Sequence, residues 1–162
     1  MNWRYLLSGG IVLAIGVCFY MTARPAANAY FLDMLPWYDR HWCALPSAFT
    51  SGRLGGALPS FLHALGFIWI CAGVTRINSR RDVLRICMLW LVIAWSFEIG
   101  QNYPDLIIIH IPDWFENFVI LENFGPYFKQ GRFDVCDLAA SAMGCAVAGL
   151  VLLMSIRKRR EA

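Results

Sequence analysis

Charged side chains are scarce in this chain. Of its 162 residues only 15% are charged, whereas 59% are hydrophobic. A soluble domain is usually about one quarter charged and about half apolar. The shortage of charge therefore argues against a soluble globular domain, and the net charge of +3 is too modest and too uneven to indicate a nucleic-acid partner. The sequence also lacks internal repeats and low-complexity tracts, and its length allows one compact bundle.

Motifs of common catalytic and metal sites are missing as well. No G-x-S-x-G sequence surrounds Ser141, so no serine nucleophile with an assigned base is evident. No tight His/Cys/Asp spacing is present, so we expect no cofactor, although a divalent cation held by acids and His63 is left open. The cysteines follow no pattern, and a disulfide between Cys43 and Cys136 is also left open. Whether the protein is an enzyme is therefore undecided.

Apolar runs long enough to cross a membrane recur along the chain. We place spans at about 5–23, 58–74, 83–101 and 136–156, each able to cross a hydrocarbon layer of about 30 Å at about 1.5 Å per residue. The predicted fold class is all-α, a four-helix transmembrane bundle that forms a single membrane domain over 1–162. The first span also resembles a signal peptide, so its cleavage near 27–29 is left open.

Basic residues predict the orientation of the bundle. Arginines crowd the link between the second and third spans, Arg4 precedes the first span, and the basic tract 157–160 follows the fourth. Because cytoplasmic loops carry the excess of Lys and Arg, both termini are predicted to be cytoplasmic. Segments 24–57 and 102–135 then lie outside. The aromatic residues of 102–130 are types that favour the membrane surface, so we expect an interfacial helix in this segment.

Polar residues collect at the outer ends of the last three predicted spans. Glu98 ends the third span and Asp137 opens the fourth, so both should lie at the same depth. Lipid cannot solvate an ionisable side chain, and such residues usually face protein or water. We therefore predict a ligand-binding polar cluster, and the alternative is that the acids cap helix ends and pair with Arg132. The candidate residues are His63, Glu98, Gln101, Arg132, Asp134, Asp137 and Ser141.

Small residues run along the predicted fourth span. Gly144, Ala148 and Gly149 belong to a ladder that would let helix backbones approach closely in lipid. We expect these residues to pack helices and the span to be central in the bundle. Alternatively, the ladder binds another membrane protein.

The polar motifs also resemble a known family. HALGF, FEIGQ and GRFDVCDLAASAMG are similar, in kind and order, to motifs of the VanZ-like membrane protein family, over about residues 55–156. Two positions depart from the family pattern, which often has Asn at Ser141 and Lys or Asp at Ser60. The link between Gln101 and Gly131 also departs from it, because the family link is commonly short and 29 residues lie between them here. The motif positions are His63, Glu98, Gln101, Gly131, Arg132, Asp137 and Gly144, with Asp134 in the same block.

The resemblance implies a function and a location. It implies a VanZ-like domain in the bacterial cytoplasmic membrane that recognises a cell-envelope amphiphile or an antibiotic of the glycopeptide type at the outer leaflet. One alternative is an enzyme that acts on a lipid or lipid-linked head group, with Glu98, Asp134 and Asp137 as acid, base or metal ligands. Another is a non-catalytic assembly subunit. The expected partners are membrane lipids, an amphiphilic ligand and, in the assembly alternative, another membrane protein.

Overall fold

The computed structural model describes residues 1–23, 53–75, 77–118 and 121–161. Within these ranges the chain is helical and contains no strand. The long helices are α1 (Trp3–Ala23), α3 (Arg53–Val74), α4 (Arg80–Gly100) and α7 (Val135–Glu161). The short ones are α5 (Pro104–Ile108), η3 (Asp113–Asn117), η4 (Leu121–Asn123) and α6 (Phe124–Gln130). Cys43 and residues 27–29 lie outside the described ranges, so neither the disulfide nor the cleavage prediction is tested.

Three helices are long and apolar enough to cross a membrane. They cover Gly55–Val74, Arg80–Gly100 and Val135–Lys158, and they correspond to three of the four predicted spans. The all-α prediction is confirmed for the described residues. The apolar stretch of α1, Trp3–Phe19, is shorter than these three.

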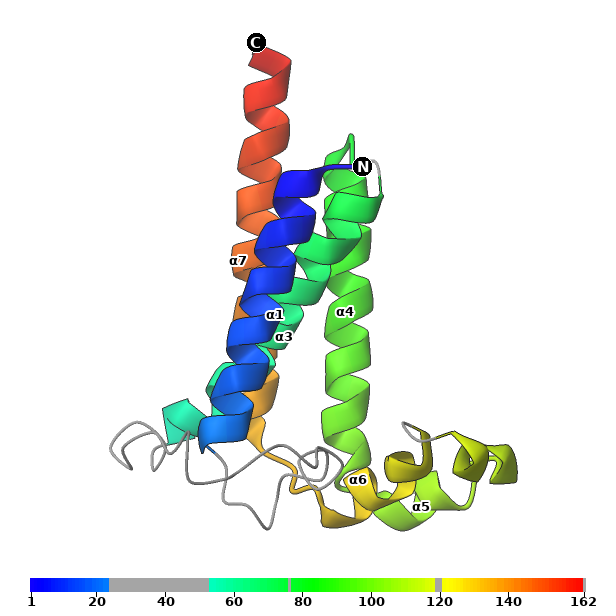
Figure 1. Ribbon diagram of the computed structural model, residues 1–162. Helices are drawn as coiled ribbons and strands as arrows, with labels where there is room; N and C mark the ends of the chain where they lie inside the picture. Colours follow the sequence, from blue (N-terminus) through cyan, green and yellow to red (C-terminus); the bar gives the residue numbers. More distant parts are fainter. Residues whose placement is uncertain (24–52, 76, 119–120, 162) are drawn as a thin grey trace.

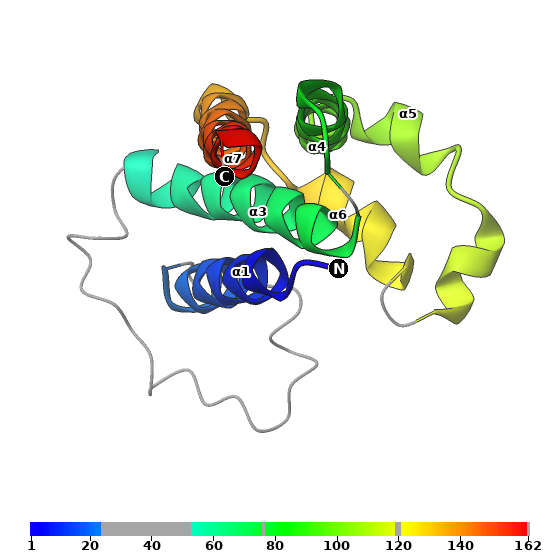
Figure 2. The ribbon, with the colours of Figure 1, turned by 90° about the horizontal axis from the view of Figure 1, so that it is seen from above.

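The four long helices lie side by side and alternate in direction. The start of α1, the link from α3 to α4 and the end of α7 lie at one end of the molecule, and the short helices lie at the other (Figure 1). Seen along the helices, α3 lies between α1 on one side and α4 and α7 on the other (Figure 2). The helix that contacts all three others is thus α3, and the expectation that the 136–156 span is central is wrong.

Small residues on two faces explain the central place of α3. Gly66 and Gly73 face α1, where an added Cβ would lie 2.7 Å from Leu13 Cγ and from the Leu6 nitrogen, respectively. On another face, Ala64 lies against Gly144 of α7. Helices in lipid associate through close packing rather than through a hydrophobic driving force, so the helix with small residues on two faces can hold neighbours on both.

The packed core lies between α3, α4 and α7. Its most deeply buried large side chains are Ile68, Val83 and Leu152, one from each helix. The apolar window of α4 is only 17% buried inside the protein, against 44% for those of α3 and α7. Most of α4 is therefore turned outward, as expected for a helix whose apolar side chains face lipid.

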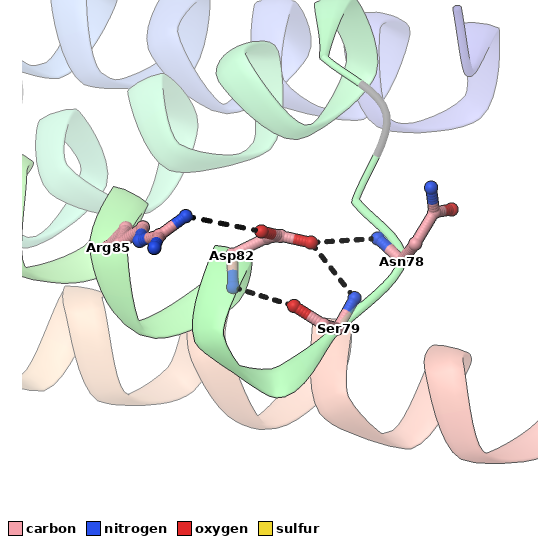
Figure 3. A network of polar contacts seen from close by, with 4 residues as sticks. All are labelled: Asn78, Ser79, Asp82 and Arg85. Atoms are coloured by element: carbon pink, nitrogen blue, oxygen red, sulfur yellow. Dashed lines mark hydrogen bonds and ion pairs between the residues drawn. The ribbon is translucent and has the colours of Figure 1, made fainter.

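The start of α4 is set by a capping box. The Ser79 hydroxyl accepts the backbone N–H of Asp82 at 3.2 Å, and the Asp82 carboxylate accepts the N–H groups of Ser79 at 3.0 Å and Asn78 at 3.2 Å (Figure 3). Arg85 lies 3.9 Å from the other carboxylate oxygen. These bonds satisfy backbone donors that the first turn of a helix leaves without partners. The hydrogen bonds of the capping box explain why α4 begins at Arg80, before the start of the span predicted from its apolar residues.

Two adjacent glycines of α1 give a first testable prediction. A Cβ at Gly9 would lie 2.7 Å from the Gly66 carbonyl oxygen and 2.9 Å from the Ile70 nitrogen, whereas a Cβ at Gly10 meets nothing within 4 Å. Gly9→Ala should lower the free energy of unfolding by about 1–3 kcal/mol, because two backbones must move apart. Gly10→Ala should leave it unchanged or raise it by up to about 1 kcal/mol. Unfolding of the purified variants in detergent measures both, and equal effects would refute this account of the α1–α3 contact.

Candidate functional site

Glu98 joins the end of α4 to the start of α7. Its side chain is only 9% exposed, and its Oε1 atom accepts the backbone N–H of Asp134 at 2.6 Å. Asp134 immediately precedes α7, and its own carboxylate accepts the N–H of Cys136 at 2.8 Å, as a helix N-cap does. Charged acceptors form the stronger hydrogen bonds to backbone N–H groups. Glu98 therefore fixes the backbone that leads into α7.

Asp137 joins the first turn of α7 to α3. The Ser60 hydroxyl donates to its Oδ1 atom at 2.8 Å. A carboxylate in the first turn of a helix is also favoured by the helix dipole. Ser141, one turn further on, is 2% exposed and donates its hydroxyl to the Leu138 carbonyl of its own helix at 2.9 Å. Two acids at similar depth thus hold α7 against two different helices.

Gln101 and Gly131 bring α6 and its following residues against the end of α4. The Gln101 amide donates to the Tyr127 hydroxyl at 2.8 Å. A Cβ at Gly131 would lie 2.6 Å from Gln101 Cδ, so the backbone approaches closely there and only glycine fits without movement. Phe128 is buried against Gly100, and its ring stacks on Phe97 at 5.8 Å. Gly131 therefore has a packing role at this junction.

Two predicted site residues lie apart from these bonds. The His63 ring lies 6.3 Å from that of Phe67, and its Cδ2 atom is 3.9 Å from where a Cβ at Gly16 of α1 would be. No hydrogen bond joins it to the other candidates among the residues described. Arg132 is exposed and forms no ion pair within the described part of the chain. Hydrogen bonds therefore connect Glu98, Asp134, Asp137 and Ser60 around the start of α7, and within the described residues His63 takes no part in these bonds.

The described residues of this junction form no group that could hold a metal ion. Within the described ranges, no three His, Cys, Asp or Glu side chains lie close enough together to hold a metal ion. The oxygen atoms of the acids instead accept hydrogen bonds from Asp134, Cys136 and Ser60.

Residues 102–130 form several short helices, and an apolar hollow lies among them. One interfacial helix was predicted in 102–130, but α5, η3, η4 and α6 occupy this segment. Pro112 precedes η3, where it offers no N–H and disfavours helical geometry in the residue before it, which explains the break. The hollow has a volume of about 430 Å³. Its lining residues are Leu106, Ile107, His110, Ile111, Pro112, Phe115 and Phe124.

Some residues of the junction were not predicted. Ser60 was noted only as a departure from a family pattern, although it lies one turn before His63. The indole N–H of Trp95 donates to the Leu138 carbonyl at 3.1 Å, and its position three residues before Glu98 was a usable signal because the two share a helix face. Tyr127 carried no such signal, since its place depends on the path of the outer segment.

Comparisons with family models, with curated proteins and with solved structures find no match. The function is therefore inferred from the residues and geometry of this chain.

Proposed function

We propose that this chain is a multi-pass protein of the bacterial cytoplasmic membrane that binds an amphiphile at the outer end of a four-helix bundle. The three helices of membrane-spanning length support the class, and α1 runs alongside α3 as a fourth helix (Figures 1 and 2). The basic link 76–85 and the basic residues after the last apolar run support cytoplasmic termini. The short helices and the start of α7 then face the outer leaflet.

The observation that carries the proposal is the apolar hollow next to the polar junction. Phe124 lines the hollow, and its ring lies 5.7 Å from that of Phe97, the residue before Glu98. An amphiphile needs an apolar surface for its chain and a polar partner for its head group. The hollow offers the apolar surface, and Arg132 offers the polar partner for the head group.

Arg132 is suited to hold an anionic head group. Its neighbour Gly131 is held against Gln101, so the backbone is positioned, while the guanidinium itself is exposed. A guanidinium binds phosphate or carboxylate through two parallel hydrogen bonds. The resemblance to VanZ-like proteins adds the class of ligand, namely a cell-envelope amphiphile or a glycopeptide antibiotic.

The hydrogen bonds of the acids favour recognition over catalysis. Glu98 and Asp137 each accept a hydrogen bond from another part of the chain, so their first role is to position α7. The small residues of α7 are likewise turned inward: Gly144 lies against α3, Gly149 lies against Cys87 of α4, and Ala148 is fully buried. Because these small residues pack helices of the same chain, they favour the amphiphile-binding proposal over the alternative in which they bind another membrane protein.

Binding of two probes tests the proposal. A fluorescent prenyl phosphate and the lipoglycopeptide teicoplanin are titrated against the purified protein in nanodiscs of zwitterionic lipid. Arg132→Gln should raise the Kd by about tenfold, because a charge-assisted hydrogen bond contributes about 1.5–3 kcal/mol. Ile107→Trp should abolish binding, since the larger side chain fills the hollow.

Two matched variants serve as controls. Lys129→Gln removes an exposed positive charge from α6 at the same end, and Ile109→Trp adds the same bulk at a side chain that is 74% exposed and does not line the hollow. Both should bind the probes as the unaltered protein does. The proposal is refuted if neither probe binds, or if the control variants lose as much affinity as the test variants.

A further inference from the structure

A second cavity lies at the opposite end of the molecule from the polar junction. It has a volume of about 810 Å³ and lies between the start of α1, the end of α3 and the last turns of α7. These three segments meet at the end that carries both chain termini (Figure 1). Cavities that bind small molecules usually measure about 300–1,000 Å³, so this one has room for a substantial ligand.

The walls of the cavity are built by tight helix contacts and by the length of α7. The Asn2 N–H donates to the Gly73 carbonyl at 2.7 Å, which ties the start of α1 to the end of α3. The 27-residue α7 continues past the end of the 22-residue α3, so its last turns stand beside open space (Figure 1). Ala72, Val151 and Leu152 give the inner wall an apolar surface.

Basic side chains stand at the rim of the cavity. Arg4 and Lys158 line it and are exposed, and neither forms an ion pair with any residue that the structure describes. Arg157, in contrast, is bonded to Glu161 at 2.8 Å. No carboxylate is found among the described residues that line the cavity. The nearby acid in the first turn of α4, Asp82, accepts the backbone N–H groups of Asn78 and Ser79 (Figure 3).

We infer that this cavity binds an anionic phospholipid from the leaflet at this end of the bundle. The phosphate would lie between Arg4 and Lys158, and an acyl chain would follow Ala72, Val151 and Leu152. An apolar wall with two cations at its rim, neither of them ion-paired to a described residue, matches the two parts of such a lipid. Basic pockets beside transmembrane helices attract anionic lipid head groups, whereas a free anion would leave the apolar wall uncovered. This site is separate from the proposed outer site, and either can exist without the other.

Lipid retention tests the inference directly. The full chain is reconstituted in vesicles of phosphatidylcholine and phosphatidylglycerol and extracted in mild detergent, and bound lipids are counted by native mass spectrometry. The double variant Arg4→Gln/Lys158→Gln should lose phosphatidylglycerol at least about tenfold, because each basic residue near a lipid surface contributes roughly fivefold to binding. The double variant Arg80→Gln/Arg81→Gln removes the same charge at the same end from exposed residues outside the cavity. It should retain the lipid.

A second pair of variants tests whether the lipid lies in the cavity. Val151→Trp places a large ring in the cavity, whereas Leu150→Trp adds the same ring at a neighbouring exposed residue that does not line it. Only Val151→Trp should reduce retention. Equal losses in the two charge variants, no loss in either, or displacement of the lipid by inorganic phosphate would overturn the inference. Unfolding curves for the charge variants, whose altered side chains are exposed, should match that of the unaltered protein.

Discussion

Replacing Gly144 by alanine is expected to lower the free energy of unfolding by about 3 kcal/mol. This value is at the upper end of the usual cost of adding a carbon atom to a well-packed core. A Cβ at this position of α7 would collide with the carbonyl oxygen of Phe61, and it would lie 3.1 Å from Ala64 Cβ and 3.3 Å from the Leu65 nitrogen. A backbone oxygen cannot rotate away as a side chain can. Relief therefore requires α3 and α7 to separate, which also opens the core contacts of the fully buried Ala148.

Unfolding of the purified variant in detergent, followed by circular dichroism, measures this loss. Gly56→Ala in α3 is the matched control, because a Cβ there meets nothing within 4 Å and alanine favours a helix more than glycine does. We expect Gly56→Ala to unfold at or slightly above the transition of the unaltered protein. If the unfolding transition of Gly144→Ala coincides with that of Gly56→Ala, the close approach of α3 and α7 is not present in the folded protein.

Replacing Glu98 by alanine is expected to cost about 2–3 kcal/mol, whereas replacing it by glutamine should cost less than about 1 kcal/mol. Alanine leaves the N–H of Asp134 without its 2.6 Å acceptor next to the long apolar part of α7. Glutamine keeps an oxygen that can accept the same bond. Hydrogen exchange at the Asp134 and Cys136 amides should be faster in the alanine variant, because the start of α7 is no longer held against α4.

The same two variants separate recognition from catalysis at this site. If Glu98 positions α7, the glutamine variant keeps both its stability and its affinity for the amphiphile probes. An acid, base or metal-ligand role requires the carboxylate, so in that case the glutamine variant would remain folded but lose activity on a lipid head group. A glutamine variant as unstable as the alanine variant would contradict the positioning role.

The approximate positions and the order of the helices long enough to cross a membrane could be predicted from the sequence. The predicted spans 58–74, 83–101 and 136–156 correspond to α3, α4 and α7, because an apolar run long enough for the bilayer is a property of consecutive residues. The true helix starts lie earlier, at Arg53, Arg80 and Val135. Polar caps such as Ser79 and Asp134 begin helices without adding to hydropathy, so the apolar runs alone do not mark them.

The segment 102–130 was less predictable for a physical reason. Its aromatic residues indicated a surface helix, but prolines divide it into short helices whose arrangement depends on packing against the end of α4. The stack of Phe128 on Phe97 joins residues that are far apart in the chain. Contacts between residues far apart in the chain leave no periodic signal in the sequence. The 430 Å³ hollow is formed by such contacts, so it could not be predicted either.

By itself, the sequence determined that the described part of the chain is helical, that it contains apolar segments long enough to cross a membrane, and that Glu98 and Asp137 lie at the ends of two of these segments. A position along a helix follows from counting residues. The direction in which each side chain points around its helix axis was decided only by tertiary packing. Glu98 reaches the backbone before α7, Asp137 reaches Ser60 of α3, and His63 lies near α1. The cavity at the other end likewise arises because helices of unequal length pack together, which no single segment specifies.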